Sequence, residues 1–233
     1  MCGRYYIDIE KDELSFVKNF SEVEYEQNFN VAPQSQAPCI IDNNLVIANW
    51  GYFPEWLKSQ SNPRPLFNTR YESLLEKKTF TSAFKNSRCL IPISGWYEWK
   101  EEGGIKQPYY FFDTSESLLF AAGLYWNRSS GDIETSIITR EAVSSLQSIH
   151  NRSPLLLTEK QRELWVSDLP SEVTLRKGTS NEAGAKVLQD GFDVTQETGA
   201  MGQAVYFTTD ENSIKVMDGY DNAEIYGDLI NDI

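Results

Sequence analysis

Residues 88–113 read RCLIPISGWYEWKEEGGIKQPYYFFD, and this stretch decides the fold. Two runs rich in apolar and aromatic residues, 88–100 and 107–113, flank the turn segment EEGGIK at 101–106. Such runs, separated by a short segment that contains glycine, are typical of a β-hairpin. The stretch therefore predicts two antiparallel strands joined by a tight turn.

The same pattern recurs along the chain. A second hairpin is predicted from LLFAAGLYWN, SSGD and IETSIIT, which together cover 118–139. Further strands are predicted at GRYYIDI (3–9), APCII (37–41) and LVIANWGYF (45–53), and helices at 12–20, 71–86, from near Glu141, and at 159–167. Hairpins with helices between some of them indicate an α+β fold in a single domain, with a mainly antiparallel sheet or open barrel-like core flanked by a few helices.

The charge is strongly negative but uneven. The net charge is −13, and ten acidic residues with one lysine follow from Asp190 onward, so −9 lies there and −4 in residues 1–189. Binding of nucleic-acid phosphates relies on Lys and Arg. A near-neutral body can still gather its arginines on one face, so the total does not exclude a DNA partner. We expect a domain over residues 1–209 and an acidic C-terminal tail over 210–233.

The cysteines fit a reducing compartment, and the hydropathy pattern predicts no membrane span. The three cysteines are odd in number and lack metal-ligand spacing, and Cys39 and Cys89 lie in apolar runs typical of a core. No apolar run reaches the roughly 18 residues of a membrane span, and the N-terminus lacks the pattern of a secretory signal. We expect a cytoplasmic protein (nucleoid-associated if bacterial) that contacts no membrane, needs no metal or cofactor and is a monomer.

The opening MCGR places a cysteine directly behind the initiator methionine. If Met1 is removed, Cys2 carries a free α-amine and a thiol on adjacent carbons. This pair condenses with an aldehyde, first to an imine and then to a five-membered thiazolidine ring. Position alone favours chance over this chemistry.

GWYEWKE, at 95–101, contains a candidate general acid. Strand alternation puts Trp96, Glu98 and Lys100 on one face of the strand. A glutamate beside a tryptophan on a buried strand has its pKa raised by desolvation and stays protonated. The alternative, which the pattern alone favours, is a solvent-facing Glu98 paired with Lys100.

SIHNRSP contains the only histidine of the chain, His150, with Arg152 two residues later. Pro154 disfavours helical geometry at the preceding residue, so His150 is expected near a helix end or in the following loop. The pKa of a histidine suits proton transfer at neutral pH, although a lone histidine is commonly a structural residue.

In FNTRYES, Asn68 and Arg70 precede a predicted helix. An asparagine there is commonly a turn or cap residue, and the arginine is either solvated or bound to a phosphate. Together with Cys2, Glu98 and His150, these residues form a plausible site for an aldehyde and an adjoining phosphate backbone.

An ordered set of motifs resembles the SRAP family (SOS-response-associated peptidases), the abasic-site processing proteins that form DNA–protein cross-links. The matching motifs run in family order over residues 1–165: MCGR, VAP (31–33), WGYFPEW (50–56), NTRYES (68–73), RCLIPISGWYEW (88–99), FAAGLY (120–125) and the T…H-x-R-x-P block from Thr139 to Pro154.

The resemblance implies an SRAP-like fold and a reaction. In this family the mature N-terminal cysteine bonds to the ring-opened aldehyde of an abasic site in single-stranded DNA, giving a stable thiazolidine that protects the lesion during the DNA damage response. Replication or repair proteins are expected as further partners. Carried over by motif, the resemblance implies that Cys2 is the nucleophile and that Asn68 orients it. Glu98 is implied as the acid catalyst, and His150 as the residue that handles a proton or assists the lyase step. Phosphate contacts are implied for Arg4, Arg70 and Arg152, and stacking or wedging for Trp99.

Two other functions fit the same residues. A thiol peptidase or self-processing protein would use Cys2 and His150, with Asn68 as the orienting amide. A non-catalytic module for single-stranded or modified DNA would depend on Arg70 and Arg152 and would not need Cys2.

Overall fold

The computed structural model describes residues 2–9, 11–19, 23–113, 118–142, 144–167 and 214–218. The strands are β1 (Arg4–Ile7), β2 (Asn28–Val31), β3 (Gln36–Ile41), β4 (Asn44–Trp50), β5 (Asn68–Arg70), β6 (Arg88–Ile93), β7 (Gly95–Glu102), β8 (Ile105–Asp113), β9 (Leu119–Asn127), β10 (Ile133–Glu141), β11 (Arg152–Pro154) and β12 (Ile214–Asp218). The helices are α1 (Lys78–Asn86), α2 (Ser144–Gln147) and α3 (Glu159–Val166), with 3-10 turns η1 (Lys11–Leu14), η3 (Glu55–Leu57) and η4 (Tyr71–Ser73).

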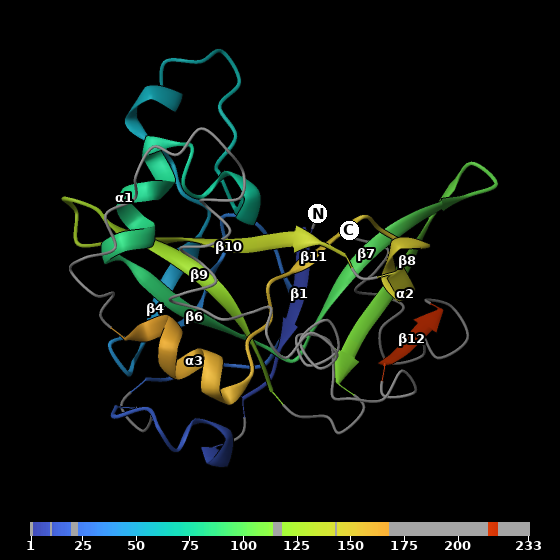
Figure 1. Ribbon diagram of the computed structural model, residues 1–233, viewed down its shortest axis with the longest axis horizontal. Coiled ribbons are helices and arrows are strands. Elements are labelled where there is room, and N and C mark those ends of the chain that lie inside the picture. Colours follow the sequence, from blue (N-terminus) through green and yellow to red (C-terminus); the bar gives the residue numbers. More distant parts are fainter. Residues whose placement is uncertain are drawn as a thin grey trace.

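The strands form a closed barrel and a second sheet. The barrel runs β10-β4-β3-β6-β9 and closes because β9 also pairs with β10, while the second sheet has the order β12-β8-β7-β1-β2. Figure 1 shows the two side by side, with α1 and α3 packed on the barrel and the β7–β8 hairpin projecting away from it. Most pairings are antiparallel; β10 runs parallel to β4 and β5. The predicted α+β fold is confirmed, and the barrel is closed rather than open.

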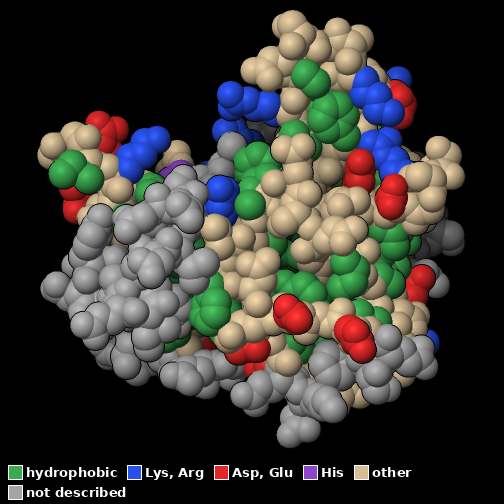
Figure 2. All heavy atoms as spheres, turned by 180° about the vertical axis from the view of Figure 1, so that it is seen from behind, with side chains coloured by type: hydrophobic (Ala, Val, Ile, Leu, Met, Phe, Trp, Pro, Cys, Tyr) green, Lys and Arg blue, Asp and Glu red, His purple; other side chains and the backbone are tan. Residues whose placement is uncertain are grey.

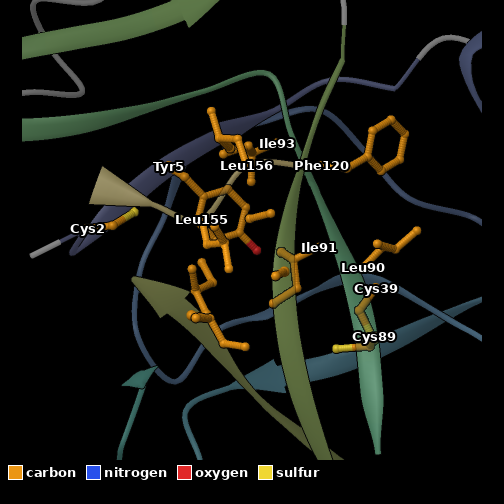
Figure 3. Packing of buried hydrophobic residues seen from close by; sticks show 14 of the residues in the cluster. Cys2, Tyr5, Cys39, Cys89, Leu90, Ile91, Ile93, Phe120, Leu155 and Leu156 are labelled. Carbon is orange, nitrogen blue, oxygen red and sulfur yellow. The ribbon is translucent and has the colours of Figure 1, made fainter. Parts of the chain in front are cut away.

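A continuous apolar core fills the barrel and reaches the second sheet. It includes all three cysteines, each at most 1% exposed, so the prediction that Cys39 and Cys89 are core residues is confirmed. Figure 3 shows Cys39 and Cys89 together on one side of this core, with Cys2 on the opposite side near Tyr5. Cys2 therefore lies where the core meets the second sheet.

Both predicted hairpins are present. Register across the first is continuous from Gly95, opposite Phe112, to Glu102, opposite Ile105. Gly103 and Gly104 form its turn with φ of +58° and +83°, a left-handed conformation that glycine adopts without steric cost. The hairpin holds the middle of β7, which carries Glu98, between β1 and β8.

Three helix predictions were too long. The predicted helix at 71–86 is divided into η4 and α1, because the backbone at Lys77 is extended (φ −97°, ψ 118°) and Leu74 is already buried in the core. The helix expected at 12–20 is only the turn η1. The one expected from Glu141 begins at Ser144, since Glu141 still pairs with Arg152 at the end of β10.

The short strands β2, β5 and β11 were not predicted, because three or four residues give no readable alternation.

Within the predicted tail, β12 pairs antiparallel with β8; the rest of residues 210–233 lies outside the described residues. Among the residues that the structure describes, no helix is long and apolar enough to cross a membrane.

Candidate active site

Cys2 is held at the junction of the barrel and the second sheet. It lies two residues before the start of β1, and its side chain is fully buried. The Nδ2 group of Asn68 donates a hydrogen bond of 2.7 Å to the Cys2 carbonyl oxygen. Asn68 Oδ1 is buried and accepts no hydrogen bond from the described residues, so it remains able to accept one. The predicted proximity of Asn68 to Cys2 is present in the structure.

Glu98 lies inside the protein rather than on its surface. The residue is 2% exposed, and burial raises the pKa of its carboxyl group to about 7. Lys100 forms an ion pair of 2.6 Å with Glu102, nearer the hairpin turn. The solvent-facing alternative for Glu98 is therefore wrong. A carboxyl group with a pKa near neutrality has both protonation states available, which suits a group that donates and then recovers a proton.

The Glu98 carboxylate affects the ionisation of the Cys2 thiol. Burial raises the pKa of the thiol well above its usual value, and the negative charge of Glu98 raises it further. The thiol is therefore protonated at neutral pH, and Glu98 lies on β7, the strand that pairs with β1 just after Cys2.

His150 follows α2, at the end of the loop before β11, as predicted. Its Nδ1 atom accepts a hydrogen bond of 3.0 Å from the backbone N–H of Arg152 and lies 3.7 Å from Glu98 Oε1. Burial, assisted by nearby positive charge, lowers the pKa of the imidazole. At neutral pH the ring is therefore neutral, and the contact with Glu98 is proximity rather than an ion pair.

The predicted phosphate-binding residues differ in how they are held. Arg152 makes a bidentate ion pair with Glu72, with Nη1–Oε1 at 2.8 Å and Nη2–Oε2 at 3.0 Å. Arg70 is exposed, and its guanidinium has no ion pair among the described residues. Arg4 donates from Nη1 to the Gly3 carbonyl oxygen at 3.0 Å. Figure 2 shows Lys and Arg side chains around a hollow in the surface between two lobes of the molecule.

Trp99 follows Glu98 on β7 and lies opposite Pro108 of β8. It is partly exposed, whereas Trp96, on the Glu98 side of the strand, is 1% exposed. The stacking or wedging role of Trp99 stays a prediction.

Strand β10 places the segments that carry these residues. On one side β5 pairs with it, Asn68 opposite Ile137 and Arg70 opposite Thr139. On the other side β11 pairs with it, Pro154 opposite Thr139. Cys2 and Glu98 reach the same region from β1 and β7, which are neighbours in the second sheet.

A buried polar contact holds β5 on β10. Thr69 and Ser136, both completely buried, share a hydrogen bond of 2.8 Å between their hydroxyl groups. Replacing Thr69 by valine leaves the Ser136 hydroxyl unpaired in the core, so we expect a loss of about 1–3 kcal/mol in the free energy of unfolding. Denaturant unfolding of Thr69→Val, Ser136→Ala and the double variant checks this. Strictly additive losses would show that the two hydroxyl groups do not interact.

Sequence reasoning did not identify Glu72, Thr69 or Ser136 as site-forming residues. Glu72 and Thr69 lie in the NTRYES motif, but partners about 80 and 67 positions away are not readable from one sequence. Within the described ranges, no group of three or more His, Cys, Asp or Glu side chains is arranged to hold a metal ion.

The fold is that of an α+β barrel protein. Its site combines a buried cysteine at the second position, a carboxyl group whose pKa is near neutrality, and a histidine that is uncharged at neutral pH. The family model described as SOS response associated peptidase (SRAP) matches residues 1–189, and the chain belongs to this family.

Several curated relatives carry a common name. The chain is 33% identical over 180 residues to the abasic site processing protein YoqW of Bacillus subtilis, covering 72% of this chain and 80% of that protein. It is 27% identical to the abasic site processing protein YedK of Escherichia coli, covering 71% and 79% of the two chains. The abasic site processing protein HMCES of Gallus gallus is 26% identical, with coverage of 66% and 59%.

Solved structures share the fold. A phage-related protein from Bordetella bronchiseptica superposes with a TM-score of 0.61 at 20% identity, covering 93% of both chains. A protein from Bacteroides thetaiotaomicron superposes with a TM-score of 0.60 at 23% identity, covering 83% of this chain and 78% of the other.

Proposed function

We propose that this protein processes abasic sites in single-stranded DNA by forming a covalent thiazolidine cross-link through Cys2, after removal of Met1. The observation that carries the proposal is the placement of Cys2: Asn68 donates a hydrogen bond to its carbonyl oxygen, and the buried Glu98, whose pKa is about 7, lies on the strand that pairs with β1. Relatives at 26–33% identity are named abasic site processing proteins, which supports DNA with abasic sites as the substrate.

The groups present suffice for each step of the reaction. The neutral α-amine of Cys2 attacks the aldehyde carbon of the opened sugar, and proton transfer from nitrogen to oxygen gives a carbinolamine. Protonated Glu98 donates to the hydroxyl group, which leaves as water, and an iminium forms. The thiol sulfur then adds to the iminium carbon, and its proton passes to the Glu98 carboxylate. One water is lost overall, and Glu98 regains its starting state.

The ionisation of these groups fits neutral pH. An α-amine has a pKa of about 7.7–8.0, so a useful fraction is uncharged. The protonated thiol carries the proton that the Glu98 carboxylate recovers in the last step. Because amine and thiol sit on adjacent carbons, ring closure is intramolecular and has a high effective concentration.

The same features argue against thiol peptidase chemistry. A peptidase cysteine works as a thiolate whose pKa is lowered by a positively charged histidine. Here burial and the Glu98 charge raise the pKa of the Cys2 thiol, and burial lowers the pKa of His150. Both shifts disfavour a thiolate–imidazolium pair.

Intact mass spectrometry tests the proposal. Protein with Met1 removed is incubated with a single-stranded oligonucleotide that carries one abasic site. We expect a species with the mass of protein plus oligonucleotide minus one water, stable to heat and denaturant. Cys2→Ala should give no stable species, and an oligonucleotide without the lesion should give none with either protein. A processed wild-type protein without the adduct, or an equally stable adduct from Cys2→Ala, would contradict the proposal.

A further inference from the structure

Glu72 connects the two segments that flank β10. It lies in η4, which follows β5 directly, and its carboxylate pairs bidentately with Arg152 at the start of β11. The two segments otherwise contact opposite edges of β10. The ion pair therefore crosses β10 and joins the segment that carries Asn68 to the one that carries His150.

Both the side chain and the backbone of Arg152 make hydrogen bonds in this arrangement. Its Nη2 group donates to the Thr139 carbonyl oxygen at 2.5 Å, in addition to its contacts with Glu72. Its backbone N–H donates to His150 Nδ1, and its carbonyl oxygen lies 3.1 Å from the same nitrogen. The side chain of Arg152 is anchored by Glu72 and Thr139, while its backbone sets the position of the imidazole.

The carboxylate of Glu72 is stabilised in its charged form. Burial opposes ionisation, but the hydrogen bond and charge of Arg152, together with the backbone of Glu72 and Glu141, outweigh it and lower the pKa of Glu72. The Glu72 side chain is about half exposed, so the ion pair adds little to stability. A bidentate guanidinium–carboxylate contact does supply geometry, because both groups are planar and fix each other's orientation.

We propose that Glu72 is a positioning residue: by holding the Arg152 guanidinium across β10, it keeps His150 with Nδ1 on the Arg152 amide and Nε2–H directed to the reacting sugar. This inference rests on the proposed cross-linking function for its kinetic part. The position of the imidazole itself is a property of the free protein and can be measured without DNA.

The test uses Glu72→Gln in protein with Met1 removed. Glu76→Gln is the matched control, because Glu76 is exposed in the same connection, and no ion pair of its side chain is described. His150 is the only histidine, so the ¹⁵N spectrum of histidine-labelled protein reports on this ring alone. Wild type and Glu76→Gln should show the Nε2–H tautomer, whereas Glu72→Gln should show averaging between both tautomers.

The kinetic readout is the cross-linking rate against the concentration of a single-stranded oligonucleotide with one abasic site. We expect Glu72→Gln to lower the saturating rate constant about tenfold, with the half-saturating concentration changed less than twofold. If Glu72→Gln folds poorly, Arg152→Lys takes its place, because it keeps the positive charge but loses the bidentate contact. Arg152→Lys should show the same change in the histidine spectrum.

Three results would overturn the proposal. Wild-type histidine signals in both Glu72→Gln and Arg152→Lys would show that the ion pair does not position the ring. An unchanged rate constant with tighter DNA binding would instead make Glu72 a competitor for phosphate. An equal loss in Glu76→Gln would make the effect one of net charge. Absence of any adduct from wild type would refute the cross-linking function and leave the spectroscopic test intact.

Discussion

Replacing Glu98 by glutamine should lower the rate of cross-link formation at pH 7.5 by about 100-fold or more, within the range typical of lost general acid–base catalysis. Glutamine has nearly the same shape as glutamate but cannot donate a proton to the departing hydroxyl group or recover one from the thiol. Since Glu98 is buried, an acid from the solvent cannot reach this position and take over its role. The measurement is the rate of adduct formation on a single-stranded oligonucleotide with one abasic site.

The pH dependence makes this prediction specific. The acid form of Glu98 is lost as pH rises through about 7, whereas the neutral amine is gained as pH rises through about 7.7–8.0. The wild-type rate should therefore pass through a maximum near pH 7.5. In Glu98→Gln only the amine titrates, so the remaining rate should rise with pH and then level off.

Glu101→Gln is the control, because Glu101 is an exposed residue on the same strand. It should keep the wild-type rate and the maximum. An alkaline decline that persists in Glu98→Gln would assign the acid to another group, His150 being the first to examine.

The same substitution should change the pH dependence of folding stability. Burial disfavours the ionised carboxylate, so the folded protein holds the Glu98 proton up to about pH 7, whereas the unfolded chain releases it near 4.5. Between these values the folded state binds more protons, and stability falls as pH rises through this window. The loss from this one group amounts to roughly 3 kcal/mol above pH 7.

Glu98→Gln lacks this titration. The free energy of unfolding of wild type relative to Glu98→Gln should fall by roughly 3 kcal/mol between pH 4.5 and 8. Urea unfolding of both proteins at several pH values measures this difference, and titrations common to both cancel. A difference that does not vary with pH would show that Glu98 ionises in the folded protein as readily as in the unfolded chain.

Much of the fold was predictable because the long strands have clear patterns. The hairpin of β7 and β8 around a Gly-Gly turn and the second hairpin at 118–139 are as expected. The run 88–100, predicted as one strand, is divided into β6 in the barrel and β7 in the second sheet. In these segments, alternation, apolar content and turn chemistry all favour the same structure. The helix at 71–86 had good periodicity, yet tertiary contacts of Leu74 and an extended Lys77 divide it. Local propensity does not contain those contacts.

The sequence predicted that the candidate site residues lie together, but it did not predict their contacts. Cys2, Asn68, Glu98 and His150 were chosen from motifs, and the structure brings all four to one region. The ion pair that occupies Arg152 joins residues 80 positions apart, and its partner Glu72 had no assigned role. The burial of Glu98 depended on which face of β7 meets the barrel. Neither fact is encoded in spacing along the chain.

The closing strand of the barrel has a consequence for biosynthesis. Asn68 is held on β10, which is complete only at Glu141, so the donor to the Cys2 carbonyl is not in place before that residue has been made. At 5–20 residues per second, translation reaches this point after roughly 7–28 s. During that interval the amino end of the nascent chain is not yet enclosed by the barrel, and we expect the removal of Met1, on which the proposed cross-linking rests, to occur then. We therefore expect this maturation step to precede the burial of Cys2.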